Sequence, residues 1–297
     1  MSGHVEPRRR FLVGLIGNGI GTSLSPALHE SEAAALGLDY RYQLIDLAGF
    51  PNPSLEDVLR YAEAMGYNGF NVTHPYKQAV IPYLDELSED AAAIGAVNTI
   101  VRHPNGRLHG HNTDWVGFAE LFARSFRYPD TENVVQLGAG GAGAAVAYAQ
   151  LKNGVSKLWV LDTEERKARQ LAENLNGIFG ANRARVVMPA DAKELIGRAS
   201  GLVNTTPIGM KEHPGMPVSI DWFSPGQWLV DIVYMPLVTE LLSSARERGI
   251  PAVGGAAMTV FQAAEAVRLI TGVEPDQERM YAHMQQFLTT RERQPTQ

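Results

Sequence analysis

Residues 134–162 read VVQLGAGGAGAAVAYAQLKNGVSKLWVLD, and this stretch decides how the rest of the chain is interpreted. Its pattern predicts a buried strand at 134–137, a glycine turn, an alanine-rich helix and a second strand at 158–161. In the turn, Gly138 permits a sharp bend, Gly140 lets the backbone approach a pyrophosphate, and Gly143 lets the helix pack closely on the sheet. The N-terminus of the helix offers free N–H groups to phosphates. The stretch therefore predicts a dinucleotide-binding unit.

Asp162 ends this stretch, 19 residues after Gly143. A carboxylate at this place accepts a hydrogen bond from a ribose 2′-hydroxyl and repels a 2′-phosphate, so it favours NAD over NADP. Two alternatives stay open. Asp162 could instead cap the next helix, with Glu165 completing a capping box, and Arg166 and Lys167 leave room for a phosphate.

The composition is that of an ordinary globular protein. The chain has 297 residues, 45% of them hydrophobic, which suffices for two domains with buried cores. Its formal charge of −6 gives no basic excess, so we expect no nucleic-acid partner. The lack of cysteine excludes disulfides and thiolate metal sites and fits a reducing compartment. The eight histidines show no metal-ligand spacing, so no metal is expected.

The N-terminus superficially resembles an export signal, because Arg8, Arg9 and Arg10 precede an apolar run. That run ends at Gly17 and is too short for the hydrophobic region of such a signal. No stretch reaches the roughly 18 apolar residues that a membrane span needs. We therefore expect a strand with a basic lead-in, and a cytoplasmic protein that binds no membrane. The tail at 291–297 is expected to be frayed.

Over the first hundred residues, short apolar strands alternate with helical segments, which predicts βαβ units and a mostly parallel sheet. The expected strands are residues 11–16, 42–47 and 69–73, and the expected helices are residues 26–36 and 54–65, followed by a helix that starts at Pro75. A hairpin signal, His-Pro-Asn-Gly, stands at 103–106.

The fold class expected is α/β with two domains. Residues 1–114 form the first, a catalytic α/β domain, and residues 115–257 form a Rossmann-type dinucleotide-binding domain. The second contains a linker helix at 115–126, the opening stretch, and further strands at 185–188, 201–204 and 228–233. Helices within 258–290 are expected to pack back onto the first domain.

Lys77 is the first candidate for the chemistry. If Pro75 starts a helix, Lys77 lies in its first turn at the carboxyl end of the strand 69–73, where α/β sheets open their crevices. The positive end of a helix dipole disfavours the charged lysine and so favours its use as a base. A solvated surface lysine is the alternative.

Other polar residues have a structural and a chemical interpretation. Asp114 or Thr113 could cap the linker helix. Ser25 could cap the helix at 26–36, whereas Ser23 has no evident structural task. Asn98 lies in an apolar strand and needs hydrogen-bond partners if it is buried.

Taken in order, these motifs resemble the signatures of the shikimate and quinate dehydrogenase family. The matching segments are residues 19–29, 71–77, 95–99, 110–114 and 138–143, followed by 204–210, 231–236 and 261–263. Their order and spacing match over almost the whole chain. The resemblance implies a two-domain α/β fold with the active site in the cleft between the domains, and an oxidoreductase that passes a hydride between a ring alcohol and NAD.

The resemblance also implies a role for individual residues. Lys77 and Asp114 would form the catalytic dyad, and the substrate would be held by Ser23, Ser25, Thr73, Asn98, Tyr234 and Gln262. The cofactor would be bound by Gly138, Ala139, Gly140, Gly141, Ala142, Gly143, Asp162, Lys167, Thr205, Pro207, Val233, Gly255 and Met258. The chain departs from the common family pattern beside the last two, at Ala257 and Thr259.

The expected reaction is oxidation of shikimate to 3-dehydroshikimate, with quinate, giving 3-dehydroquinate, left open as a second substrate. His74 and Tyr76 resemble the NAD-using branch, in which some quinate-oxidising members have threonine where this chain has Ser25. One alternative is a dehydrogenase of a modified shikimate such as aminoshikimate. Another is an inactive nucleotide-sensing paralogue, against which the intact Lys77 and Asp114 argue. The expected partner is a small molecule, and the protein is expected to be a monomer or a homodimer that serves aromatic amino acid biosynthesis or quinate metabolism.

Overall fold

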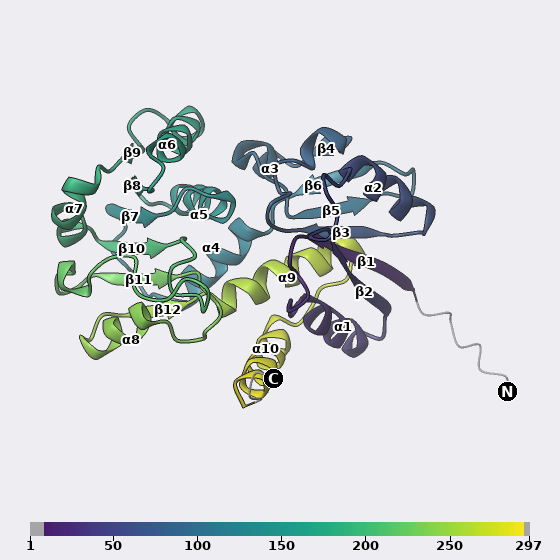
Figure 1. The fold of residues 1–297 in the computed structure, drawn as a ribbon. Coiled ribbons are helices and arrows are strands. Elements are labelled where there is room, and N and C mark those ends of the chain that lie inside the picture. Colours follow the sequence, from purple (N-terminus) through teal and green to yellow (C-terminus); the bar gives the residue numbers. More distant parts are fainter. Residues whose placement is uncertain (1–8, 294–297) are drawn as a thin grey trace. The chain divides into compact units, whose positions relative to one another are not determined.

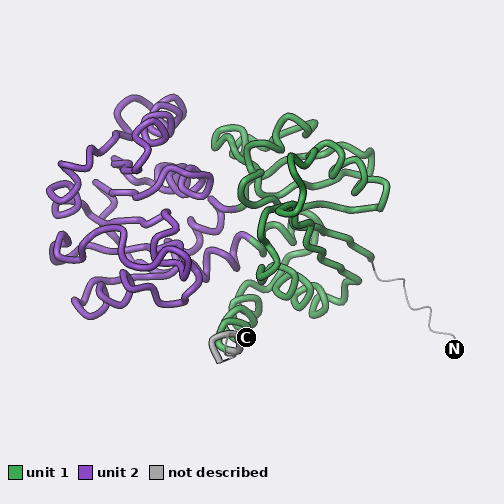
Figure 2. The backbone as a smooth tube through the Cα atoms, in the orientation of Figure 1, with its two compact units in different colours: residues 1–113, 263–297 green, residues 114–262 purple. Residues whose placement is uncertain are grey.

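The computed structural model describes residues 9–293, which divide into two compact units (Figure 2). Unit 1 takes the chain up to Thr113 and again from Ala263, and unit 2 takes Asp114 to Gln262. The chain thus leaves unit 1 once, completes unit 2 and returns. The return falls inside helix α9 (Ala256–Thr271) rather than ahead of it.

Unit 1 is built on a six-stranded sheet in the order β2-β1-β3-β5-β6-β4. Strand β5 runs antiparallel to β3 and β6, and the remaining neighbours are parallel, so the predicted mostly parallel sheet and hairpin are both confirmed. The strands are β1 (Arg10–Gly17), β2 (Asp39–Asp46), β3 (Gly69–Val72), β4 (Glu86–Leu87), β5 (Thr99–Arg102) and β6 (Leu108–His111). The helices are α1 (Ser25–Ala35), α2 (Leu55–Ala64), α3 (Glu89–Ile94) and α10 (Gln277–Arg293), with a 3₁₀ turn η1 (Ile81–Tyr83).

The helix expected to start at Pro75 does not form. Residues 74–80 make a series of turns that leads into η1, and the next α-helix begins only at Glu89. Tertiary contacts explain the difference, because the carbonyl of Lys77 accepts a hydrogen bond from the backbone of Val97 and the side chains of Tyr76 and Val80 are buried in the core of unit 1. Local helix signals are weak compared with such packing.

Unit 2 is a six-stranded, all-parallel sheet in the order β12-β11-β10-β7-β8-β9, and Figure 1 shows the strand labels in this sequence. The strands are β7 (Asn133–Leu137), β8 (Lys157–Leu161), β9 (Ala184–Val186), β10 (Gly201–Asn204), β11 (Trp228–Asp231) and β12 (Ala252–Gly254). The helices are α4 (Asp114–Ser125), α5 (Gly141–Lys152), α6 (Glu165–Phe179), α7 (Ala192–Arg198), α8 (Glu240–Glu247) and α9. The strand order reverses between β7 and β10, and ligands of open α/β sheets bind at such a switch point.

The C-terminal helix α10 is fixed to α1 inside unit 1. Glu32 is fully buried, and its carboxylate accepts hydrogen bonds from Arg279 Nε at 2.8 Å and from the backbone N of Asp276 at 2.7 Å. A buried carboxylate needs such partners. Because α10 reaches Arg293, residues 291–293 are helical, which corrects the frayed tail expected there; Arg8 and residues 294–297 lie outside the described residues.

Between residues 9 and 293, no helix combines the length and the apolar character that crossing a bilayer requires. Over the same residues, no three histidine or carboxylate side chains are grouped so that they could hold a metal ion.

Candidate active site

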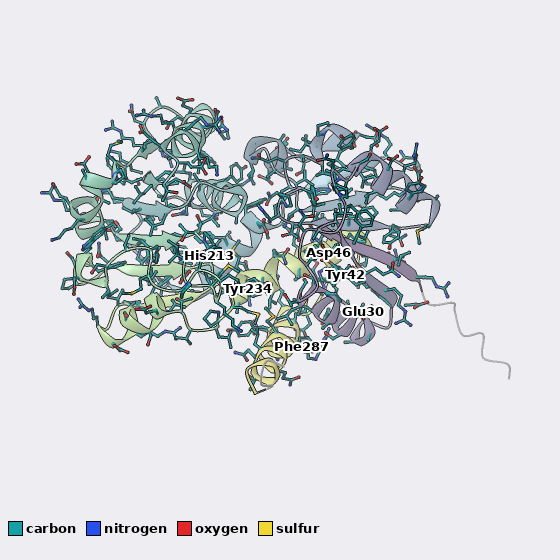
Figure 3. The ribbon with its side chains drawn as sticks, viewed as in Figure 1. Glu30, Tyr42, Asp46, His213, Tyr234 and Phe287 are labelled. Atoms are coloured by element: carbon teal, nitrogen blue, oxygen red, sulfur yellow. The ribbon has the colours of Figure 1, made fainter. Side chains whose placement is uncertain are left out.

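The loop that carries Ser23 is held by a carboxylate at the end of β2. Asp46, which is labelled in Figure 3, accepts hydrogen bonds from the backbone N of Gly19 at 2.9 Å and of Ile20 at 3.0 Å. These backbone donors, with that of Ala48 first among them, keep the pKa of Asp46 below its usual value. The position of the loop before α1 therefore depends on a residue more than 20 positions away.

The structural roles of the two serines in this loop are the reverse of those expected from sequence. Leu24, not Ser25, occupies the N-cap position of α1, and Ser25 is the first helical residue. Ser23, which seemed to have no structural task, accepts a hydrogen bond from the backbone N of Ser25 at 3.2 Å. The hydroxyl of Ser25 instead interacts with that of Tyr42 on β2. Ser25 is thus free of the capping role that was the structural explanation for it.

A buried polar chain crosses the sheet of unit 1 from Tyr42 to Thr113. Tyr42 Oη donates to Asn71 Oδ1 at 2.9 Å, and Asn71 Nδ2 donates to Thr99 Oγ1 at 3.0 Å. Thr99 Oγ1 in turn donates to Asn98 Oδ1 at 3.1 Å. These side chains are all buried, and burial raises the pKa of Tyr42 so that its hydroxyl stays protonated.

Asn98 has the hydrogen-bond partners that its buried position requires. It is 3% exposed, and its Oδ1 accepts from the backbone N of Thr113 at 2.7 Å while its Nδ2 donates to Thr113 Oγ1 at 3.0 Å. This pairing fixes the residue immediately before Asp114. Asp114 is the first residue of α4 and is 7% exposed.

Thr73 and Lys77 follow the carboxyl end of β3. The backbone N of Thr73 donates to the carbonyl of Ile16 at 2.9 Å, which extends the β1–β3 ladder by one residue. Both side chains are half-buried. Because no helix starts at Pro75, Lys77 has no helix dipole beneath it, and that argument for a base no longer applies.

In unit 2, the glycine turn has the form expected of a phosphate-binding turn. Gly138 has a φ of +96°, and a Cβ there would lie 2.7 Å from Thr205 Oγ1. A Cβ at Gly143 would lie 2.6 Å from the Gly138 carbonyl oxygen. At Gly140, which occupies the N-cap position of α5, a Cβ would meet nothing within 4 Å. The turn is therefore crowded beneath and open where a pyrophosphate would approach, so it fits a dinucleotide.

Two side chains from neighbouring strands hold this turn. Thr205, directly after β10, donates from Oγ1 to the carbonyls of Leu137 at 2.7 Å and Gly138 at 3.0 Å. Asp162, directly after β8, accepts from the backbone N of Ala139 at 2.7 Å. Both residues were expected to contact the cofactor, and the structure shows that each of them holds the glycine turn.

Asp162 does not cap α6. The N-cap position belongs to Glu164, which makes no capping side-chain hydrogen bond, and Asp162 Oδ1 accepts from the backbone N of Glu164 at 2.8 Å. The capping alternative is thus wrong. Lys167 forms an ion pair with Glu164 at 2.5 Å, and this contact is the main reason that the pKa of Lys167 is raised.

Most of the other residues expected to contact the cofactor follow the carboxyl ends of β10, β11 and β12, and two belong to the glycine turn after β7. Pro207 lies in the loop after β10, the turn residues Gly141 and Ala142 begin α5, and Met258 is buried in the first turns of α9. Val233 is buried, and its backbone N donates to the buried carboxylate of Asp231 at 3.2 Å. Gly255 packs so closely that a Cβ would overlap the carbonyl of Ile232.

Tyr234 and Gln262, expected to hold the substrate, belong to unit 2. Tyr234 follows β11 and is 36% exposed, and it is labelled in Figure 3. Gln262 lies on α9, where its Nε2 donates to the carbonyl of Thr259 at 2.9 Å. The remaining substrate candidates belong to unit 1, and Asp114 begins unit 2.

Several residues of these networks were not identified from sequence. Asn71 and Thr99 stood inside quoted motifs without a role, and Tyr42 was treated only as part of a strand. Gln136 was counted in an apolar run, although it is fully buried in β7 and donates to the carbonyl of Gly138 at 2.9 Å. A polar side chain in a strand that is covered on both faces needs partners, and that signal was available in the sequence.

Comparisons with known proteins give a consistent result. Residues 15–100 match the family model described as the shikimate dehydrogenase substrate binding domain. The shikimate dehydrogenase (NADP(+)) of Streptomyces avermitilis is 49% identical over 94% of this chain and 97% of its own length. The quinate/shikimate dehydrogenase (NAD(+)) of Corynebacterium efficiens is 44% identical over 92% of this chain and 96% of its own length.

Solved structures agree with these sequence relatives. The quinate dehydrogenase from Corynebacterium glutamicum in complex with NAD superposes with a TM-score of 0.91, at 42% identity, over 94% of this chain and all of that one. The shikimate 5-dehydrogenase from Listeria monocytogenes in complex with shikimate and NAD gives a TM-score of 0.84 at 30% identity, over 92% of this chain and 96% of that one. The chain therefore belongs to the shikimate dehydrogenase family.

Proposed function

We propose that this protein oxidises shikimate to 3-dehydroshikimate with NAD, and that quinate, giving 3-dehydroquinate, is its second candidate substrate. Relatives that match nearly the whole chain are named as shikimate or quinate/shikimate dehydrogenases. The observation that carries the proposal is the buried polar chain from Tyr42 to Thr113. It joins Tyr42 to motif residues from three separate segments, 71–77, 95–99 and 110–114, and it ends immediately before Asp114.

Asp162 is the main support for NAD. Sequence identity alone does not decide the cofactor, because relatives at 49% and 44% identity are named for NADP and NAD respectively. The carboxylate of Asp162 is held at the glycine turn by Ala139, where an anion favours a ribose 2′-hydroxyl over a 2′-phosphate. Glu164 adds a second negative charge and pairs with Lys167, one of the two cations that left room for a 2′-phosphate.

In the proposed mechanism, Lys77 and Asp114 together accept the proton of the reacting hydroxyl. When bound, NAD supplies the ring that accepts a hydride from the alcohol carbon. As the carbon–hydrogen bond breaks, the O–H proton must pass to a base within hydrogen-bond reach, and the carbonyl forms. We assign that base to the pair formed by Lys77 and Asp114. The missing helix dipole removes the reason to prefer Lys77 alone, so the proton is assigned to neither residue by itself.

The remaining polar residues would orient the substrate. We propose that Ser23, Ser25, Thr73 and Asn98 of unit 1, with Tyr234 and Gln262 of unit 2, hold its hydroxyls and carboxylate. On this proposal unit 1 is the substrate domain and unit 2 the cofactor domain. Ser25 is the position to examine for quinate, because it interacts with Tyr42 and one extra hydroxyl is a difference that a single pocket residue can decide.

The deciding experiment is an absorbance assay for reduced nicotinamide with purified protein. Shikimate and quinate are each combined with NAD and with NADP, and we expect turnover of shikimate with NAD to exceed the other combinations. Turnover with NADP alone would refute the assignment of Asp162. No turnover with either substrate would refute the proposed reaction.

Two alternative functions are tested in the same assay. Aminoshikimate, as a third substrate, tests a dehydrogenase of a modified shikimate, because one substituent is a difference that a few pocket residues can decide. Binding of NAD without turnover of any substrate would support an inactive nucleotide-sensing paralogue. Placement in the cytoplasm and a monomeric or homodimeric state stay predictions, which cell fractionation and light scattering would check.

A further inference from the structure

Two buried glutamines lie beneath the glycine turn of unit 2. Gln136 is in the central strand β7 and is fully buried, and Gln150 is on α5 and 3% exposed. Neither belongs to a residue set that the proposed reaction uses. Buried amides require an explanation, because each must find hydrogen-bond partners away from water.

The amide of Gln136 is fully engaged. Its Nε2 donates to the carbonyl oxygens of Gly138 and Gly143, both at 2.9 Å, and its Oε1 accepts from Gln150 Nε2 at 2.7 Å. Both hydrogens and the acceptor are thus in use. The side chain has one orientation that satisfies all three contacts, and Gln150 sets it.

The two carbonyls held by Gln136 enclose the part of the turn that faces a phosphate. Gly138 comes directly after β7, and Gly143 lies in the first turn of α5. The backbone N–H groups between them belong to Ala139, Gly140, Gly141 and Ala142. Gln136 therefore fixes the distance between the end of the strand and the start of the helix. Thr205 and Asp162 hold the same turn from the neighbouring strands.

The pair is not arranged for stability alone. Within residues 9–293, no hydrogen-bond donor reaches the buried Gln150 Oε1. An unsatisfied buried oxygen costs free energy, which two apolar side chains of the same length would avoid. The contacts of Gln136 and Gln150 are better explained by a role in holding the glycine turn.

We propose that Gln136 is a positioning residue for the cofactor, oriented by Gln150, which sets the glycine turn to receive the pyrophosphate. The inference rests on the proposed function only in that NAD is the ligand. Because Gln136 acts through the turn, the effect should fall on ligands that carry a pyrophosphate and leave the substrate side unchanged.

The test is Gln136→Met, which keeps the length and removes the amide. Titration calorimetry with NAD and with ADP should show both bound about 5- to 20-fold more weakly, the loss expected for one or two hydrogen bonds. The KM for NAD should rise by the same factor, while kcat at saturating NAD and the KM for shikimate stay within about twofold. Equal affinity for NAD in the variant and the wild type would overturn the inference, as would a loss confined to kcat.

Gln227→Met is the matched control. Gln227 is also a buried glutamine of unit 2 whose Nε2 donates to two carbonyls, those of Ile196 and Ala199, but it lies ahead of β11, away from the turn. It should lower the unfolding temperature and leave NAD affinity unchanged. Equal weakening of NAD binding by both variants would mean that a general loss of stability in unit 2 explains the effect, and this result would refute the inference.

A second variant covers the case in which Gln136→Met does not fold. Gln150→Met leaves both donors of Gln136 in place and removes only the contact that orients them, so we expect NAD and ADP to bind about 2- to 3-fold more weakly. Unchanged binding in this variant would contradict the role of Gln150. Wild-type protein that binds neither NAD nor NADP would refute the proposed function itself, whereas wild-type binding with unaffected variants would refute only the inference.

Discussion

The two units use sheets of equal strand number and assemble their polar residues in different ways. In unit 2 the sheet is all parallel, and the glycine turn with its acid is contained in 29 consecutive residues, 134–162. In unit 1 one strand runs antiparallel, and the polar chain from Tyr42 to Thr113 joins residues far apart in sequence. A ligand turn can be specified locally, whereas a network of side chains depends on which strands become neighbours.

The difference extends to what each unit's residues do. In unit 2 the residues of the turn are set by backbone conformation and close packing, as at Gly138 and Gly143. In unit 1 the decisive groups are side chains whose positions follow from long-range hydrogen bonds, as for Asn98. On the proposed function, substitution of Lys77 in unit 1 should therefore change turnover, whereas substitutions in the glycine turn of unit 2 should change cofactor binding.

The largest expected effect belongs to Lys77. Lys77→Ala should lower kcat by about 10²- to 10⁴-fold, the usual worth of a general base, and leave the dissociation constant for NAD within about twofold. Calorimetry and steady-state assays measure the two quantities. Lys193→Ala, on the exposed surface of α7, is the control and should behave as wild type. Loss of NAD binding in Lys77→Ala would contradict the prediction that Lys77 affects turnover without affecting cofactor binding.

Two glycines of one turn should respond differently. Gly138→Ala puts a Cβ at a φ of +96° and 2.7 Å from Thr205 Oγ1, so the free energy of unfolding should fall by about 2–4 kcal/mol. Gly140→Ala meets no obstruction and should change stability by less than about 0.5 kcal/mol. Its methyl group instead stands where the pyrophosphate approaches, and NAD should bind about tenfold more weakly. Thermal unfolding and calorimetry together check both, and equal behaviour of the two variants would contradict the geometry of the turn.

Acid should weaken unit 1 through two of its histidines, His29 and His111. His29 packs between Tyr40 and Tyr42, and burial lowers its pKa to about 3, while burial chiefly lowers that of His111 to about 4. Between pH 6.5 and 3 the unfolded chain binds a proton at His29 that the native state does not. The stability present above pH 6.5 is therefore lost as the pH falls, by about 3 kcal/mol at pH 4 for His29 alone.

The measurement is denaturant unfolding at pH 7 and at pH 4. His29→Gln should lose less stability between these two values than the wild type does, because the glutamine does not titrate. His213→Gln, an exposed position in unit 2, should keep the wild-type pH dependence. The same slope in all three proteins would show that His29 does not couple folding to pH.

The smallest effect expected is in cofactor preference. Asp162→Asn keeps an oxygen that can accept from Ala139 and removes the charge, so the ratio of kcat/KM for NAD to that for NADP should fall about tenfold. Asp162→Ser should shift the ratio similarly. It should also lower the free energy of unfolding by about 1 kcal/mol, because the shorter serine side chain loses the hydrogen bond from the backbone N of Ala139. An unchanged ratio in both variants would leave Asp162 only its role in holding the turn.

The sequence predicted most of the secondary structure because its signals were local. The hairpin signal at 103–106 acts within a few residues, and the structure has the corresponding antiparallel pair of β5 and β6. The helix predicted to start at Pro75 does not form, because the carbonyl of Lys77 accepts a hydrogen bond from the backbone N of Val97, which lies 20 residues later in the chain. No local pattern contains that information.

For the candidate site, the sequence by itself determined the glycine turn, the acid at Asp162 and the motif residues. Their types and spacing suffice, because a turn that receives phosphates is built from consecutive backbone groups. Only the tertiary structure decided that Ser23 rather than Ser25 supports the start of α1, that Asp162 and Gln136 hold the turn, and that a polar chain leads to Asp114. The physical reason is that buried polar groups must find partners, and strand pairing decides which partners are near.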